Sequence, residues 1–234
     1  YYDQLGSSYS DQPDDPSLWR IERFLEEVEQ VRAALGLENF YLYGQSWGSM
    51  LAIEYALKYQ RHLKGLVLSS MTASIPSYMA YTAKLRAALP RDAVATLEKY
   101  EATNSYDAPE YQQVIKEVLY KRHVCRLDPW PDFVVRSFDR MATPIYHYMA
   151  GPSEFRIIGT LREWDIMDRL GEIRVPTLVS GGEFDECRPV HLLEIHERIP
   201  GSRLEIIPDG SHLCFAEHPE VYMPMLRSFL AEHE

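Results

Sequence analysis

The sequence predicts an α/β fold in which a mostly parallel sheet is interrupted by an inserted helical segment. In the first third of the chain, strand, helix and strand patterns follow one another at the spacing of a parallel βαβ unit. Helical patterns without β-rich runs extend from residue 73 to about residue 165, and alternating strands and helices then resume. We therefore expect two domains, a core formed by residues 1–72 and 169–234 and a helical cap formed by residues 73–168.

The first third contains the elements of the βαβ unit. Apolar residues recur at three- and four-residue steps over 17–36, which predicts an amphipathic helix capped by Ser17 and ended by Gly36. A short apolar run over 40–43 indicates a strand buried on both faces. The pattern then predicts a helix over 50–59 and a second strand over 65–69.

The remainder contains the inserted helices and the second half of the sheet. The insertion carries helical stretches over 78–88, 92–100, 110–123 and 131–141, broken by Pro90, Pro109, Pro129 and Pro144. The second half predicts a strand over 176–182, a helix over 190–199, a strand over 203–207 and a helix over 219–232.

The composition is that of a globular protein and excludes several functions. Hydrophobic residues make up 46% of the 234 residues, enough apolar surface to offset the cost of ordering the chain. The 24 Lys and Arg against 35 Asp and Glu give a net charge of −11, which argues against nucleic-acid binding. No apolar run approaches 18 residues, so no membrane span is expected. Cys125, Cys187 and Cys214 lack metal-ligand spacing and are expected to be reduced thiols.

The segment Gly44-Gln45-Ser46-Trp47-Gly48 matches the pattern G-x-S-x-G, directly after a predicted strand and directly before a predicted helix. In such a turn the serine is held in a strained conformation, and we expect side chains at both glycines to collide with the neighbouring strand and helix. The N-terminus of the helix adds backbone N–H groups and partial positive charge near a developing oxyanion. The pattern therefore predicts a nucleophilic Ser46.

A serine nucleophile needs a base, and the base needs an orienting carboxylate. In this type of fold the order along the chain is serine, acid, histidine. Asp185 follows the strand over 176–180 and His212 follows the strand over 203–207, so both lie at the carboxyl edge of the sheet. Glu183 is the main alternative acid, and Asp209 is a weaker one.

The other histidines are expected to be surface or structural. His191 and His196 are five residues apart on one helix, so they do not share a face as a metal pair would. The histidines without a strand-end context are His62, His123, His147, His218 and His233.

Seven segments of the sequence are similar to segments of one known protein family, and the similarity covers essentially the whole chain. They are YDQLG at 2–6, GQSWG at 44–48, HLKGLVLSS at 62–70, GPSEF at 151–155, GTLREWDI at 159–166, GEFDE at 182–186 and GSHL at 210–213. The chain resembles the prolyl iminopeptidases of the α/β-hydrolase fold, especially the tricorn-interacting aminopeptidases. The resemblance implies that Ser46 is the nucleophile, Asp185 the orienting acid and His212 the general base. It also implies that the backbone N–H of Trp47 is one oxyanion donor.

The resemblance implies a second device, in which Glu154 and Glu186 bind the free α-amino group of the substrate. Two carboxylates beside a charged amine make charge-assisted hydrogen bonds that a blocked N-terminus cannot make. Selectivity for proline would need a compact apolar slot. Aromatic candidates for its lining are Tyr146, Tyr148, Phe155, Trp130 and Trp164.

The implied activity is that of a serine aminopeptidase that releases N-terminal proline, or another small or hydrophobic residue, through an acyl-enzyme. We expect no metal and no cofactor, and we expect short peptides or amino-acid amides with a free N-terminus as partners. Two alternatives remain open. One is an amino-acid amidase or esterase on the same scaffold, and the other is a catalytically silent binding protein of the hydrolase fold.

The sequence departs from the family pattern in three places. It begins at Tyr1 with no upstream HGGPG-type segment, so we expect a fragment whose N-terminal strands and second oxyanion donor lie on a missing piece, present as a separate chain or cleaved. A targeting segment would also lie there, so the cytoplasmic location that we expect rests on composition alone. The loop over 6–10 differs from the family's glycine-rich pattern, which affects substrate preference, and Ser49 replaces a glycine at the helix start.

Overall fold

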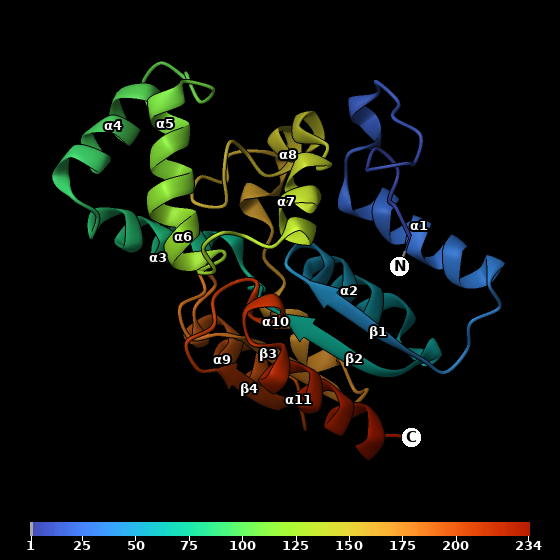
Figure 1. Ribbon diagram of the computed structural model, residues 1–234. Coiled ribbons are helices and arrows are strands. Elements are labelled where there is room, and N and C mark those ends of the chain that lie inside the picture. The colour runs from blue at the N-terminus through green and yellow to red at the C-terminus, as the bar shows by residue number, and fades with distance from the viewer. Residues whose placement is uncertain (1) are drawn as a thin grey trace.

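Four parallel strands form a single sheet in the computed structural model, which describes residues 2–234 (Figure 1). The strands are β1 (Phe40–Gln45), β2 (Leu63–Ser69), β3 (Thr177–Gly182) and β4 (Arg203–Ile207), and they lie side by side in this order. Each neighbouring pair is parallel. The predicted α/β class with a parallel sheet is therefore confirmed.

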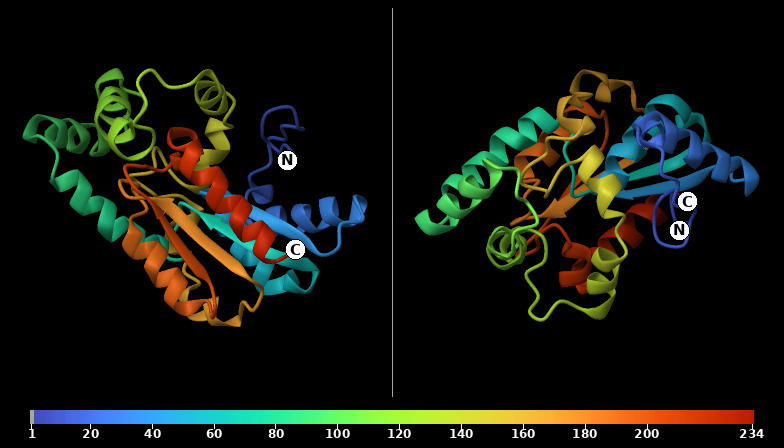
Figure 2. Two further views of the ribbon diagram at one scale, coloured as in Figure 1. Left: turned by 60° about the horizontal axis from the view of Figure 1, so that its bottom comes forward. Right: turned by 90° about the horizontal axis from the view of Figure 1, so that it is seen from above.

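Helices cover both faces of the sheet. Successive side chains of a strand point to opposite faces, and on β2 the apolar side chains of both faces pack against helices. On β2, Leu66 and Leu68 pack in the same core as helices α2 (Trp47–Tyr59) and α9 (Pro189–Arg198). Val67 points the other way and packs against α11 (Pro219–Glu232). Figure 2 shows α11 on one side of the sheet and α2 and α9 on the other.

The first helix, α1 (Ile21–Ala34), begins later than its sequence pattern predicts. Ser17 does not cap it, because Ser17 lies in a separate 3-10 turn, η1 (Pro16–Leu18), where its N–H donates to the Asp15 carboxylate at 3.0 Å. The predicted end is confirmed, since Gly36 follows the helix with a left-handed φ of +62°.

Strand β1 is only half-buried along most of its length, which corrects the prediction of a strand buried on both faces. It is the first strand in the sheet order, so within the described residues it pairs with β2 alone. A strand with one neighbour keeps part of its surface in contact with solvent.

A helical segment connects β2 to β3 and lies beyond the carboxyl ends of the strands (Figure 1). Its helices are α3 (Ile75–Ala87), α4 (Arg91–Glu101), α5 (Pro109–Gln113) continuing through the π-helical Val114–Tyr120 into α6 (Lys121–His123), α7 (Asp132–Asp139) and α8 (Thr143–Met149). Part of the segment has its own core, which includes Leu97, Tyr111 and Leu119. Helix α8 was not predicted, because Pro144 indicates a break; in the structure it stands in the first turn of α8, where proline is tolerated.

The last third of the chain contains one helix that the sequence pattern does not show. Helix α10 (Cys214–Glu217) is a single turn between β4 and α11. Cys125, Cys187 and Cys214 are free and buried, which agrees with the expected reduced thiols. Among the described residues, no helix combines the length and the apolar character that crossing a bilayer requires.

Candidate active site

Ser46 occupies the sharp turn between β1 and α2. Its φ of +56° is unusual for a residue with a side chain, and its N–H is held by the Ser69 carbonyl at the end of β2, at 3.0 Å. Trp47 is the first residue of α2, so its N–H has no partner within the helix and lies beside Ser46. The turn therefore combines a strained serine with an N–H donor at the positive end of a helix.

The two glycines of the turn differ in how closely other atoms approach them. This corrects the expectation that a side chain at either position would collide with the neighbouring strand and helix. A Cβ on Gly44 would lie 2.2 Å from the Gly48 carbonyl oxygen, so only glycine fits where β1 passes the start of α2. A Cβ on Gly48 would meet nothing within 4 Å among the described residues. Ser49 is more than tolerated: its hydroxyl lies 2.8 Å from the Gly44 carbonyl and accepts the Ser69 N–H at 2.9 Å. Ser49 thereby joins α2 to both strands.

Asp185 and His212 meet at the carboxyl edge of the sheet. Oδ1 of Asp185 lies 3.0 Å from Nδ1 of His212, and both residues are buried. The same Oδ1 accepts the N–H of Cys187 at 2.8 Å. Glu183, the main alternative acid, instead accepts the N–H of Asp209 at 3.1 Å. Of these acids, Asp185 is the one in contact with His212.

Close backbone packing fixes the two loops that carry these residues. A Cβ on Gly182 would lie 2.3 Å from the Gly210 carbonyl oxygen, which also accepts the Phe184 N–H at 2.8 Å. On the other side of the histidine loop, Glu217 accepts both the N–H and the hydroxyl of Ser211. No sequence motif marks Glu217, because its partners depend on the fold of the loop.

Glu186 also contacts the imidazole, which sequence reasoning did not predict. Its Oε1 lies 2.9 Å from Nδ1 of His212, while its Oε2 is buried without a hydrogen-bond partner among the described residues. Burial raises the pKa of Glu186 to about 8, even though the positive charge of His212 opposes the shift. Burial disfavours the charged imidazolium, but the negative charges of Glu186 and Asp185 outweigh it and hold the pKa of His212 well above its ordinary value.

The same three residues are, among residues 2–234, a group of acidic and histidine side chains that lie close enough together to share a metal ion. Asp185, Glu186 and His212 each offer one ligand atom, and the atoms lie within 4.8 Å of one another. A proton on Nδ1 of His212, shared with the two carboxylates, accounts for the same arrangement.

The helical segment is tied directly to the histidine loop. The N–H groups of His212 and Leu213 donate to the carbonyls of His123 and Val124, both at 2.9 Å. Nδ1 of His123 lies 2.8 Å from the carbonyl oxygen of Phe184, in the loop that carries Asp185. His123 thus links α6 to both loops, a role that depends on contacts between distant segments and that its sequence context does not indicate.

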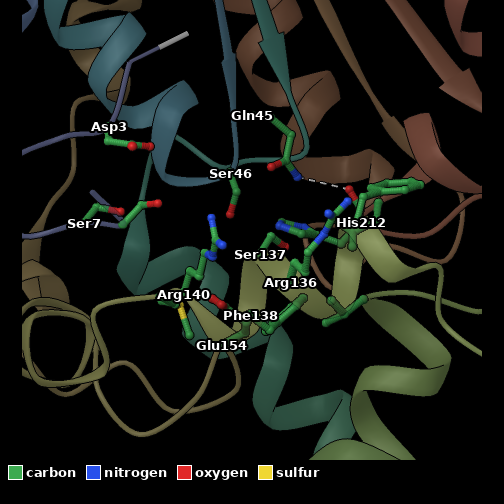
Figure 3. A pocket seen from close by; sticks show the side chains of 15 residues that line it. Asp3, Ser7, Gln45, Ser46, Arg136, Ser137, Phe138, Arg140, Glu154 and His212 are labelled. Carbon is green, nitrogen blue, oxygen red and sulfur yellow. Dashed lines mark hydrogen bonds between the residues drawn. The ribbon is translucent and has the colours of Figure 1, made fainter. Parts of the chain in front are cut away.

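Two cavities adjoin Ser46. The outer one has a volume of about 550 Å³ and is lined by Ser46, His212 and Glu154, with Arg136 and Arg140 on the side of α7 (Figure 3). The inner one, about 260 Å³, is mostly apolar and shares Ser46 and Glu154 with the outer one. Burial raises the pKa of Glu154 above its ordinary value, although the positive charge of His212 opposes the shift.

Of the five aromatic residues suggested for the apolar slot, Tyr146 alone is among the residues that line the inner cavity. Phe155 is buried in the core of the helical segment, and Tyr148 is exposed. Trp130 donates to the Cys125 carbonyl, and Trp164 donates to the Glu54 carboxylate at 2.8 Å. The rest of the inner lining is largely aliphatic and includes Met50, Met71, Ile145, Met149 and Ile157.

The N-terminal loop forms the remaining wall of the site. Gln4 and Gly6 line the inner cavity, and Asp3 and Ser8 line the outer one. Nε1 of Trp47 donates to the Gln4 side chain at 3.1 Å. The loop over 6–10, where the sequence departs from the family pattern, therefore lies beside the nucleophile.

Known proteins resemble this chain in sequence and in fold. A family model described as the alpha/beta hydrolase fold matches residues 1–219. The proline iminopeptidase of Flavobacterium johnsoniae is 43% identical over 232 residues, which cover 98% of this chain and 78% of the relative. The crystal structure of VinJ superposes with a TM-score of 0.96 at 35% identity, over 100% of this chain and 80% of that one. The proline iminopeptidase of Mycobacterium smegmatis gives 0.90 at 35% identity, over 100% and 79%.

Proposed function

Because the chain belongs to the proline iminopeptidase family of α/β hydrolases, we propose that it is a serine aminopeptidase acting on short peptides with a free N-terminus. Its substrates would begin with proline or another small or hydrophobic residue. The observation that carries the proposal is that Ser46, His212 and Glu154 line one cavity, with Asp185 behind the imidazole.

In the proposed reaction, His212 removes the proton of the Ser46 hydroxyl as its oxygen attacks the carbonyl carbon of the first residue. Asp185 keeps a proton on Nδ1 of His212, which leaves Nε2 free to act as the base. The oxyanion of the tetrahedral intermediate accepts the N–H of Trp47 at the positive end of α2.

The second half of the reaction uses the same groups. The protonated His212 gives its proton to the leaving amine, the C–N bond breaks and an acyl-enzyme remains on Ser46. Water then attacks the ester carbonyl with His212 as the base. The C–O bond to Ser46 breaks as His212 returns the proton to the serine oxygen, which releases the amino acid and restores the free serine.

Recognition of the free amine is proposed for Glu154 and Glu186. Glu154 lies where the two cavities join, so an ammonium group beside it would leave the adjacent ring in the apolar inner cavity. Glu186 lines neither cavity: its Oε1 contacts His212, and its Oε2 is buried without a hydrogen-bond partner in the part of the chain that the structure describes. Bringing an ammonium group to these carboxylates supplies the counter-charge that the imidazolium supplies in the free enzyme.

The test is a comparison of kcat/KM for proline p-nitroanilide, its N-acetyl form, prolinamide and p-nitrophenyl acetate. We expect the free-amine anilide to exceed the acetylated one by about 10²–10³-fold, the loss that an unpaired buried charge causes. Equal turnover of the two anilides would remove the amine-binding role. Faster turnover of the simple ester than of any prolyl substrate would favour an esterase, and no turnover at all would favour a binding protein.

A further inference from the structure

Two arginines on one wall of the outer cavity have no assigned role. Arg136 lies in α7 and Arg140 directly follows it, and Figure 3 shows both side chains extending into the cavity from the side opposite Asp3 and Gln45. The Arg140 guanidinium lies 4.7 Å from the centre of the Tyr9 ring. The arginines that form ion pairs within the described residues are others: Arg23, Arg32, Arg86, Arg156, Arg162, Arg169 and Arg203.

The two cavities differ in the charged residues that line them. Glu154 lines both cavities, whereas Arg136 and Arg140 line only the outer one. The Asp3 carboxylate also lines this cavity and lies 3.4 Å from the N–H of Tyr9. In a chain with a net charge of −11, two arginines that have no ion-pair partner among residues 2–234 attract an anion to this wall.

The proposed reaction determines which part of a peptide reaches the arginines. With the ammonium group at Glu154 and the first ring in the inner cavity, the scissile carbonyl lies at Ser46 and the leaving residue lies in the outer cavity. The C-terminal carboxylate of a dipeptide belongs to that leaving residue, and each further residue moves it outward by up to about 3.3–3.6 Å. A carboxylate that lines both cavities and arginines that line only the outer one match the opposite charges at the two termini of a short zwitterionic peptide.

We propose that Arg136 and Arg140 bind the free C-terminal carboxylate of di- and tripeptide substrates, a role that rests on the aminopeptidase activity proposed above. Guanidinium groups suit carboxylates because they can donate two parallel hydrogen bonds. Both arginines are exposed, so salt and water screen the attraction and the gain is moderate, about threefold to tenfold in kcat/KM.

The experiment compares kcat/KM for Pro-Ala, Pro-Ala amide and Pro-Glu amide, and for a series from Pro-Ala to a proline followed by four alanines. For the wild-type protein we expect Pro-Ala to exceed its amide about threefold to tenfold, with a smaller advantage at 0.5 M NaCl and for the longest peptide. In the double variant Arg136→Met/Arg140→Met the ratio of acid to amide should approach one. Arg91→Met removes a positive charge from the exposed start of α4, outside both cavities, and should keep the wild-type ratio.

The outcomes separate the two proposals. In the wild-type protein, a ratio near one between kcat/KM for Pro-Ala and kcat/KM for its amide, with good turnover of prolyl substrates, would overturn the carboxylate site. The aminopeptidase proposal would then still stand. A preference for Pro-Glu amide over Pro-Ala would assign the arginines to an acidic side chain instead of the terminus, and would also overturn the site as proposed. No turnover of any peptide would overturn both. Circular dichroism and thermal melting establish that each variant is folded.

Discussion

The carboxyl edge of the sheet and the helical segment above it contribute to the site in different ways. At the edge, backbone contacts leave no room for change: a Cβ on Gly44 or Gly182 would collide with backbone atoms, and these glycines adjoin the loops of the reacting groups. In the helical segment, Arg136 and Arg140 are exposed and Glu154 is half-buried. In the proposed reaction, the reacting groups are therefore positioned by rigid strand ends, whereas the side chains proposed to select the substrate belong to the helical segment.

The largest expected effect is at the rigid edge. Ser46→Ala should lower kcat for proline p-nitroanilide by about 10⁴-fold or more, because removing a nucleophile removes the acyl-enzyme route. The fold should persist, since alanine is smaller than serine and Ser46 anchors the turn through its backbone N–H. Steady-state kinetics together with a urea melt would test this, and activity that survives in a folded variant would remove Ser46 from the reaction.

The second-largest loss of activity is expected from a substitution in the helical segment. Glu154→Gln should lower kcat/KM for the free-amine anilide by about 10²–10³-fold, because the ammonium group loses its charged partner. The N-acetyl substrate should be affected far less, so the ratio between the two substrates falls. Glu163→Gln is the matched control, because Glu163 lies in the same segment and its side chain is 82% exposed. Equal losses for both substrates would show that Glu154 supports the fold and not the amine.

The two glycines of the elbow offer a matched test of the rigidity of the edge. Gly44→Ala should destabilise the protein by about 1–3 kcal/mol or more, because a Cβ there meets the backbone of Gly48. Gly48→Ala should stabilise it by up to about 1 kcal/mol, because alanine favours a helix and the site is open. Urea unfolding of both variants measures the difference, and similar stabilities would contradict the close approach of β1 and α2.

The smallest effect is a shift of a pH profile. The charges of Glu186 and Asp185 keep the pKa of His212 high, so the rate should rise as the pH rises and the imidazole loses its extra proton. Glu186→Gln removes one of these charges, so the rising limb of kcat/KM should move to lower pH. In the wild-type protein, the positive charge of the bound substrate's ammonium group should lower the pKa of His212. The rising limb of kcat should therefore lie at lower pH than the rising limb of kcat/KM. If the rising limb of kcat/KM stays at the same pH in the Glu186→Gln variant, Glu186 does not control the pKa of the His212 base.

Much of the rigid region is readable in the sequence. The strand patterns and the turn Gly44–Gly48 lie close together in the chain, and Asp185 and His212 both follow strands, so a parallel sheet places them at one edge. The difference between Gly44 and Gly48 is not readable, because it depends on which backbone atoms face each glycine after packing.

The helical segment is less predictable, because its roles depend on contacts between distant residues. The sequence predicts a surface or structural role for His123, and the structure agrees with the structural one, but the partner of His123, Phe184, lies 61 residues away and is not indicated by the sequence. Glu186 was assigned by resemblance to the amine, and the structure adds a contact with His212 that the sequence does not indicate. Among the aromatic candidates, composition alone did not separate Tyr146 from the residues that form the core of the segment.

The most direct measurement is covalent labelling with a diphenyl phosphonate analogue of proline that keeps its ring nitrogen free, followed by peptide mapping by mass spectrometry. Attack by an activated serine would leave one adduct, on the peptide that contains Ser46. The account predicts that this adduct forms rapidly in the wild-type protein, slowly in His212→Ala and not in Ser46→Ala, and that acetylating the ring nitrogen slows it. An adduct on another residue, or equal labelling by the acetylated analogue, would contradict it.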